Sequence, residues 1–257
     1  MLTLSGVTKS FDGRRVLNGL DLAVHAGESV ALLGANGSGK TTTLRCIVGL
    51  AHPDAGRIEV AGVDGVRRPL DARRRISYLP QTSAFPSTLT VRDTLAFVAR
   101  VRGLGRREAD REIEACGLTS LGDRNVGQLS GGERQRLAMA AAFLPDVDVY
   151  LFDEPSVNLD PLASRLLFQR ARQLRRDGRT LLFSTHVPAD IRHLASRAVF
   201  LRHGRIDAEA TGDLELRRFE RLLERDLWGD DDDIPDRDRA DAAVRLDRRL
   251  HGAGAVA

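Results

Sequence analysis

A glycine-rich segment between an apolar run and a helical pattern carries the clearest chemistry in this chain. Its sequence, Gly34-Ala-Asn-Gly-Ser-Gly-Lys-Thr41, fits G-x-x-x-x-G-K-[ST], the pattern of loops that wrap nucleotide phosphates. Such glycines let backbone N–H groups converge on phosphate oxygens, and the following helix adds its positive dipole end. Lys40 is predicted to bridge phosphate oxygens, and the Thr41 hydroxyl to ligate Mg²⁺. The predicted binding residues are Gly34, Ala35, Asn36, Gly37, Ser38, Gly39, Lys40, Thr41 and Thr42.

The use of lysine in this chain supports the role of Lys40. Among 39 basic residues only Lys9 and Lys40 are lysines. A compact ammonium fits among phosphate oxygens where a planar guanidinium would be too wide. We therefore interpret Lys40 as a phosphate-binding residue and not as an ordinary surface cation.

Two carboxylates close an apolar run about 110 residues after the glycine-rich segment. The run Val147–Phe152 is followed by Asp153-Glu154-Pro155. A carboxylate that ends a buried strand is where a P-loop enzyme holds Mg²⁺, so Asp153 is predicted as a metal ligand. Glu154 is predicted to project the other way and to polarise water for attack on a γ-phosphate. Alone, Asp153 could merely cap a strand, but the preceding P-loop favours the catalytic interpretation.

A second glycine-containing segment, Leu129-Ser-Gly-Gly-Glu133, precedes a helical pattern. Ser130 and Glu133 form S-x-x-E, a capping box that by itself would simply begin a helix. The N-terminus of that helix is also a site for an anion. Both interpretations of the segment can hold together.

The elements that position these residues alternate between strands and helices. Strands are expected at Leu2–Val7, Leu20–Val24, Glu28–Gly34, Arg57–Val60, Arg75–Leu79, Val147–Phe152, Thr180–Ser184 and Ala198–Leu201, with a turn at Asn18-Gly19. Helices are expected at Thr41–Gly49, within Val91–Leu121 (Leu95, Val98, Val101 and Leu104 on one stripe) and at Asp160–Asp177. This order predicts an α/β fold, a P-loop NTPase with a mostly parallel sheet and a helical insertion from about 85 to 145.

Composition narrows the classes of function. A net charge of +3, from 39 basic and 36 acidic residues, is weak evidence for a nucleic-acid partner, and we expect none. Cys46 and Cys116 lie on different expected helices and are expected to be reduced core residues. No signal peptide is expected, and no apolar run reaches the roughly 18 to 20 residues of a membrane span. If the chain serves transport, another polypeptide must provide the passage.

The segment Leu129–Glu133, followed by Arg134-Gln-Arg136, is similar to the signature of ATP-binding-cassette (ABC) ATPases. Residues 1 to about 212 resemble one ABC nucleotide-binding domain, which implies a small antiparallel β subdomain beside the parallel sheet. Glu133 departs from the family pattern, in which Gln is typical. The resemblance makes ATP the nucleotide, with Mg²⁺ as its ion.

The resemblance also implies roles for residues that the patterns alone do not assign. Phe11, with Val16 nearby, matches the adenine-stacking position, although Tyr is commoner there. Gln81 matches the glutamine that reaches Mg²⁺ and senses a transmembrane partner, and Asp160 matches the D-loop aspartate. His186 matches the histidine that contacts the γ-phosphate. Ser130, Gly131, Gly132 and Glu133 match a signature that faces the γ-phosphate held by the other subunit.

These roles predict the ATP-hydrolysing subunit of an ABC transporter, on the cytoplasmic face of the cell membrane. Two copies, or this chain and a second ATPase subunit, would pair head to tail and drive separate transmembrane permease subunits. The stretch Leu89–Phe97 resembles exporter-type, ABC-2-like ATPases. The stretches Ser156–Pro161 and Ser184–Val187 resemble ATPases of systems that mature copper in nitrous-oxide reductase.

Two other functions and the C-terminal region remain open at this point. The chain would alternatively be a soluble ABC ATPase acting on nucleic acid or the ribosome, or a nucleotide-binding scaffold without turnover. Residues 213–257 are predicted to form a helix, Leu214–Leu227, followed by a charged tail. That tail is either solvated and disordered or a segment that binds a partner or a second copy.

Overall fold

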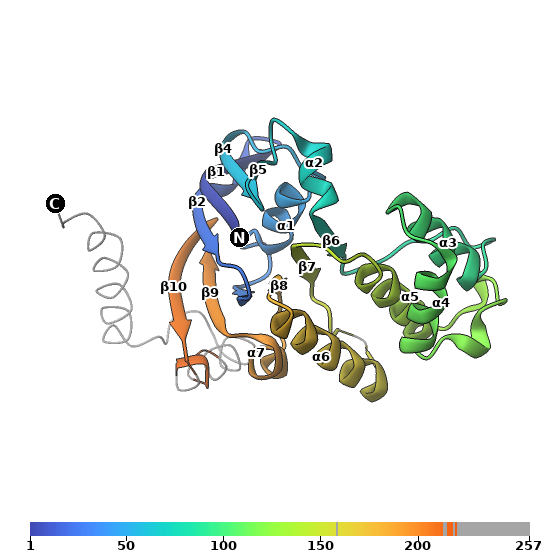
Figure 1. Cartoon of the computed structure of the whole chain (residues 1–257). Helices are drawn as coiled ribbons and strands as arrows, with labels where there is room; N and C mark the ends of the chain where they lie inside the picture. Colours follow the sequence, from blue (N-terminus) through green and yellow to red (C-terminus); the bar gives the residue numbers. More distant parts are fainter. Residues whose placement is uncertain (158, 213–214, 218, 220–257) are drawn as a thin grey trace.

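Two β-sheets form the centre of the fold in the computed structural model, which describes residues 1–157, 159–212, 215–217 and 219 (Figure 1). The larger sheet has the strand order β10-β9-β3-β8-β7-β6, and every neighbouring pair in it except β9 and β10 is parallel. Its strands are β3 (Ser29–Leu33), β6 (Ile76–Leu79), β7 (Val149–Asp153), β8 (Thr180–Ser184), β9 (Arg197–Arg202) and β10 (Arg205–Thr211). The predicted mostly parallel sheet is confirmed.

The smaller sheet is antiparallel, with the order β2-β1-β4-β5. Its strands are β1 (Leu2–Phe11), β2 (Arg14–Val24), β4 (Ala55–Val60) and β5 (Val63–Asp64). The predicted turn at Asn18-Gly19 is wrong, because both residues lie inside β2 and the chain reverses at Asp12-Gly13. Gly19 has φ +70° and interrupts the register between Val7–Leu20 and Thr8–Asn18, so this glycine makes a β-bulge.

Helices cover the parallel sheet and form a group of their own at one side of the molecule (Figure 1). They are α1 (Lys40–Ile47), α2 (Pro69–Arg74), α3 (Val91–Val101), α4 (Arg106–Ala115), α5 (Gly131–Phe143), α6 (Pro161–Arg176) and α7 (Pro188–Leu194), with 3₁₀ turns at Thr119–Leu121 and Val126–Gln128. None of the helices in the described part of the chain is long and apolar enough to cross a membrane.

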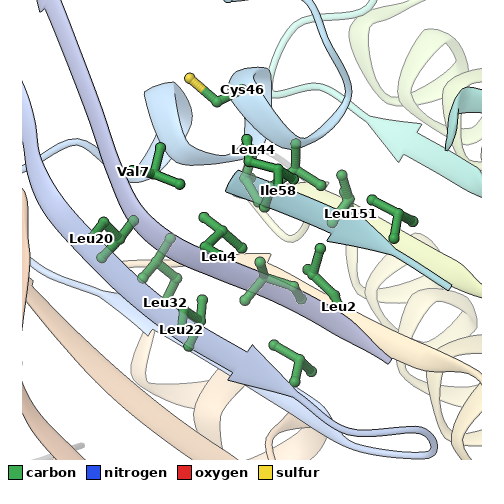
Figure 2. Close-up of a cluster of buried hydrophobic side chains, with 14 of the residues drawn as sticks. Leu2, Leu4, Val7, Leu20, Leu22, Leu32, Leu44, Cys46, Ile58 and Leu151 are labelled. Carbon is green, nitrogen blue, oxygen red and sulfur yellow. The ribbon is translucent and has the colours of Figure 1, made fainter. Parts of the chain in front are cut away.

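Alternation along the buried strands divides the core into two layers, one on each face of the parallel sheet. Val30 and Leu32 of β3 point into one cluster, while Ala31 and Leu33 point into the other. Figure 2 shows the first cluster, where Leu4 and Leu22 of the antiparallel sheet meet Leu44 of α1 and strands of the parallel sheet. The second cluster packs that sheet against α5, α6 and α7. A sheet buried on both faces explains why its strands are nearly continuous apolar runs.

The helical insertion has a third cluster of its own, built from α3, α4 and α5. Leu95 is fully buried there, whereas Val101 is 67% exposed, so the expected stripe is wrong at that residue. Two steps of three residues rotate a side chain by about 120° around a helix, which carries Val101 off the buried face. Cys46 and Cys116 are both buried and form no disulfide, as predicted.

The C-terminal predictions fall almost wholly outside the described residues. Residues 215–217 and 219 are helical, and Leu216 and Phe219 pack on the second core cluster. The remainder of the helix expected at Leu214–Leu227, and the tail to residue 257, lie outside the described residues. The proposed boundary at residue 212 stays a prediction.

Candidate functional site

The predicted site residues gather where β3, β8 and β7 end. These three strands are parallel neighbours in the sheet, so their carboxyl ends meet at one edge. The glycine-rich loop leaves β3, Asp153 closes β7, and His186 follows β8 by two residues. The carboxyl edge of such a sheet is where α/β proteins place their ligands.

Close packing requires two glycines of the loop between β3 and α1, Gly34 and Gly39. Gly34 has φ +143°, and a Cβ atom there would lie 2.3 Å from the carbonyl oxygen of Leu201. Gly39 has φ +113°, and its Cβ would lie 2.8 Å from Leu17 Cδ2 and 3.2 Å from the carbonyl oxygen of Val16. The first turn of α1 has neither a side-chain cap nor an acidic residue. Its N–H groups are therefore suited to an anion.

Lys40 lies inside this loop and is only 6% exposed. Its Nζ donates hydrogen bonds to the carbonyl oxygens of Gly34 (2.7 Å) and Ala35 (3.2 Å). An ammonium has three donors, so a phosphate oxygen can be added as a further acceptor. Burial lowers the pKa of Lys40, while the nearby carboxylates of Glu154 and Asp153 act in the opposite direction.

Asp153 is buried and held by hydroxyl groups from three elements. Its Oδ1 accepts hydrogen bonds from Ser184 Oγ (2.5 Å) and Thr41 Oγ1 (3.1 Å), and the Tyr78 hydroxyl lies 3.5 Å from Oδ2. Burial raises the pKa of Tyr78 to about 12, so this phenol remains a neutral donor. Tyr78 and Ser184 were not predicted. Their signal is a polar residue near the carboxyl end of a buried strand, and Ser184 pairs with Asp153 in the sheet register.

The oxygen atoms of Thr41 and Asp153 suit a magnesium ion. Both are hard ligands, and their 3.1 Å separation lets one ion contact both. Mg²⁺ is usually held by one or two carboxylates together with substrate phosphates and water. The described residues contain no cluster of three or more His, Cys, Asp or Glu side chains that could hold a metal.

Glu154 has other partners than Asp153 and lies against Gln81 and His186. Its Oε2 accepts a hydrogen bond from Gln81 Nε2 (2.7 Å), and its Oε1 lies 3.2 Å from His186 Nδ1. Its backbone has φ +51°, unusual for a residue other than glycine, and its N–H is held by the carbonyl oxygen and Oγ of Ser184 (3.1 and 3.0 Å). Backbone strain of this kind concentrates at functional sites.

The signature-like segment lies elsewhere in the chain, at the start of α5. The capping box is present: Glu133 Oε2 accepts from the Ser130 N–H (2.7 Å), and Ser130 Oγ accepts from the Glu133 N–H (3.3 Å). Within the described ranges, no hydrogen bond or ion pair joins Ser130–Glu133 to the glycine-rich loop. A Cβ on Gly132 would instead lie 3.4 Å from Oδ2 of Asp160, the residue that caps α6 through the Ala163 N–H (2.7 Å).

The two candidates for adenine contact lie on the antiparallel sheet. Phe11, at the end of β1, is 46% exposed and carries Lys9 Nζ 5.1 Å from its ring centroid. Val16 packs against the first core cluster, and its carbonyl oxygen adjoins Gly39 of the loop. The fold therefore brings this sheet to the side of the glycine-rich loop.

Comparison with known proteins shows a family to which this sequence is similar and several relatives. Residues 17–157 match a family model described as "ABC transporter". The Nod factor export ATP-binding protein I of Burkholderia lata is 40% identical over 207 residues, which cover 79% of this chain and 68% of that protein. The daunorubicin resistance ATP-binding protein DrrA3 of Streptomyces coeruleorubidus is 38% identical over 216 residues, covering 82% and 68%.

Solved structures of ATP-binding cassettes are also similar to this chain. The structure of an ATP-binding subunit of an ABC transporter superposes with a TM-score of 0.80 at 30% identity, over 88% of this chain and 99% of that one. A dimeric ATP-binding cassette in a post-hydrolysis state, bound to ADP and Pi, superposes with a TM-score of 0.75 at 26% identity, over 82% and 98%.

Proposed function

This chain belongs to the ABC transporter family, and from that premise we propose which residues perform its ATPase chemistry and how two copies share it. The chain is an ATP-binding and ATP-hydrolysing subunit of an ABC transporter, as its sequence predicted. The assignment of residues rests on one observation: Lys40, Asp153 and Glu154 lie together at one edge of the sheet, and each contacts different partners.

In this proposal the glycine-rich loop and Lys40 bind the β- and γ-phosphates of ATP. Thr41, Asp153 and Gln81 would hold Mg²⁺, which neutralises charge on the phosphate oxygens when it is bound. Glu154 accepts a proton from the attacking water as general base, and His186 contacts the γ-phosphate. Gln81 and His186 each lie against one oxygen of Glu154, and a carboxylate oxygen can accept more than one hydrogen bond, so the attacking water can be added as a further donor.

We further propose that two chains pair head to tail, so that Ser130 of one and Lys40 of the other contact the same ATP. The separation of the signature from the glycine-rich loop within one chain supports this arrangement. ABC cassettes similar to this chain form dimers in solved structures. ATP would close the pair, and hydrolysis would reopen it.

Export by separate permease subunits, at the cytoplasmic face of the membrane, is the transport function that we propose. It is supported by relatives whose names refer to Nod factor export and daunorubicin resistance. Gln81 and the helical insertion would face those subunits. The narrower resemblance to copper-maturation ATPases stays a prediction, and no observation favours action on nucleic acid.

The substitution Glu154→Gln tests the assignment of the base. It keeps the shape of the side chain but removes its basicity, so turnover should fall roughly 10²- to 10⁴-fold while ATP binding persists. Glu114→Gln, the same change at an exposed position of α4, is the matched control and should keep full turnover. Wild-type turnover by Glu154→Gln would overturn the assignment.

Mixing two inactive variants tests the shared sites. Ser130→Arg places a bulky cation at the proposed seam, and Lys40→Ala removes the phosphate-binding ammonium. In a mixed dimer one composite site carries both changes and the other carries neither, so partial ATPase activity should return. If mixing never restores turnover, the head-to-tail model is wrong for the isolated chain.

A further inference from the structure

A buried carboxylate, Asp190, lies between the two loops that carry Glu154 and His186. The residue is fully buried in the first turn of α7, and the ATPase chemistry proposed above does not use it. Its Oδ2 accepts hydrogen bonds from Thr185 Oγ1 (2.7 Å) and from Ser156 Oγ (2.8 Å). Its Oδ1 is buried without a hydrogen-bond partner. One oxygen atom therefore joins two segments that are about thirty residues apart in the sequence.

The two hydroxyl groups belong to opposite sides of the proposed hydrolysis site. Ser156 stands two residues after Glu154 on the chain that leaves β7, and this chain continues to Asp160. Thr185 directly precedes His186 on the chain that leaves β8. The pairing of β7 with β8 ends at Asp153 and Ser184. Beyond that pair the bridge through Asp190 restrains the relative position of the two loops.

The packing of α7 on the sheet holds Asp190 in place. Its neighbours Ile191 and Leu194 on α7 are buried in the second core cluster, which anchors the helix to the sheet. Thr185 Oγ1 also accepts a hydrogen bond from the Val187 N–H (2.9 Å), which holds this oxygen close to the start of α7. Burial raises the pKa of Asp190, and the hydrogen bonds from Thr185 and Ser156 partly offset that effect. A buried carboxyl group without such partners would be costly.

We propose that Asp190 is a positioning residue of the ATPase site, which holds the Glu154 loop and the His186 loop in the register that hydrolysis requires. The geometry it maintains is the 3.2 Å approach of His186 Nδ1 to Glu154 Oε1. The inference rests on the roles proposed above for Glu154 and His186. The hydrogen bonds of Asp190 go to Ser156 and Thr185, on the loops of Glu154 and His186, so its loss should affect the chemical step and leave the binding of ATP phosphates at Lys40 intact.

Steady-state kinetics and equilibrium ATP binding on the full chain test the proposal. Asp190→Ala should lower kcat about 10- to 100-fold, as expected for a small misplacement of catalytic groups, and leave the Kd for ATP within about threefold. Asp190→Asn keeps an oxygen that can accept both hydroxyls and should restore most of kcat. Ser156→Ala and Thr185→Val should each lower kcat, and neither should add fully to Asp190→Ala.

Thr180→Val is the matched control for Thr185→Val. Thr180 is a buried threonine on β8, hydrogen-bonded to the carbonyl oxygen of His25 at the opposite end of the strand from His186. Its loss should lower stability without changing kcat. If Asp190→Ala does not fold, Ser156→Ala and Thr185→Val test the proposal instead, since each removes one of the two hydrogen bonds to Asp190.

Two results would overturn the proposal. The first is that a folded Asp190→Ala protein, or both Ser156→Ala and Thr185→Val, have a kcat close to that of wild type. The second is that Asp190→Asn is as inactive as Asp190→Ala. Glu154→Gln, measured alongside, separates this failure from a failure of the proposed function. If Glu154→Gln is inactive and the Asp190 variants are active, only the positioning role is wrong. If Glu154→Gln is active, the site assignment itself is wrong.

Discussion

Two glycines of the phosphate-binding loop should differ sharply in their tolerance of alanine, because only one is packed against backbone. A Cβ atom on Gly34 would lie 2.3 Å from the carbonyl oxygen of Leu201 and 2.8 Å from Ser38 Oγ. A Cβ on Gly37 would meet nothing within 4 Å. Both residues have positive φ, +143° at Gly34 and +80° at Gly37, so alanine is strained at both positions. Only Gly34→Ala adds a collision that a backbone carbonyl cannot avoid by a rotamer change.

The magnitudes follow from these two effects. The strained backbone alone should lower the free energy of unfolding of Gly37→Ala by about 1 to 2 kcal/mol. Overpacking adds roughly 1 to 3 kcal/mol, so Gly34→Ala should lose about 2 to 5 kcal/mol. For a chain of this size, 1 kcal/mol shifts Tm by about 2 to 4 °C. Gly34→Ala should therefore melt roughly 4 to 20 °C lower than wild type, and Gly37→Ala roughly 2 to 8 °C lower.

Scanning calorimetry of the full chain without nucleotide measures both Tm values under one condition. Gly37→Ala is the internal control, since it has the same substitution, loop and sign of φ. Equal Tm losses in the two variants would refute the packing argument, and so would a Gly34→Ala protein as stable as wild type. In either case the approach of Leu201 to the loop could not be as close as the structure has it.

Three further perturbations test other parts of the structure. Lys40→Arg should impair equilibrium ATP binding nearly as much as Lys40→Ala, because the buried ammonium lies between two loop carbonyls and a guanidinium is wider. An Arg variant with unchanged affinity for ATP would contradict this prediction. Burial raises the pKa of Cys46 to about 11 and also raises the pKa of Cys116. Both thiols should therefore resist iodoacetamide at pH 7 in the folded chain and react after denaturation. Rapid labelling of the folded chain would show that these thiols are not buried. Hydrogen bonds from Ser130 hold the pKa of Glu133 below its usual range, so this carboxylate stabilises the fold at neutral pH and loses that effect as acid protonates it. The Tm advantage of wild type over Glu133→Gln should therefore shrink below about pH 4. A Tm difference that stays constant with pH would contradict this role of Glu133.

Some elements of the fold were harder to predict than others, for local physical reasons. The turn expected at Asn18-Gly19 is a bulge within β2, because a glycine with positive φ serves a turn and a bulge equally well. The short helices α2 and α7 were not expected, since six or seven residues give too little periodicity to recognise. Val101 was placed on the buried stripe of α3 but is exposed, because two steps of three residues from Leu95 turn it about 120° around the helix.

The sequence by itself determined the chemistry-bearing residues and the strands that precede them. An apolar run followed by glycines and Lys40 is a local pattern, and the run expected at Glu28–Gly34 forms the fully buried β3, Ser29–Leu33. Tertiary structure decided which of these residues touch. Thr41 and Ser184 both bind Asp153 because β3, β8 and β7 lie side by side, an order that differs from their order in the chain. The hydrogen bond of Gln81 to Glu154 likewise joins residues 73 positions apart, and that of Ser156 to Asp190 joins residues 34 positions apart. Hydrogen bonds act only over about 3 Å, so contacts of this kind depend on strand order and packing and cannot be derived from local sequence.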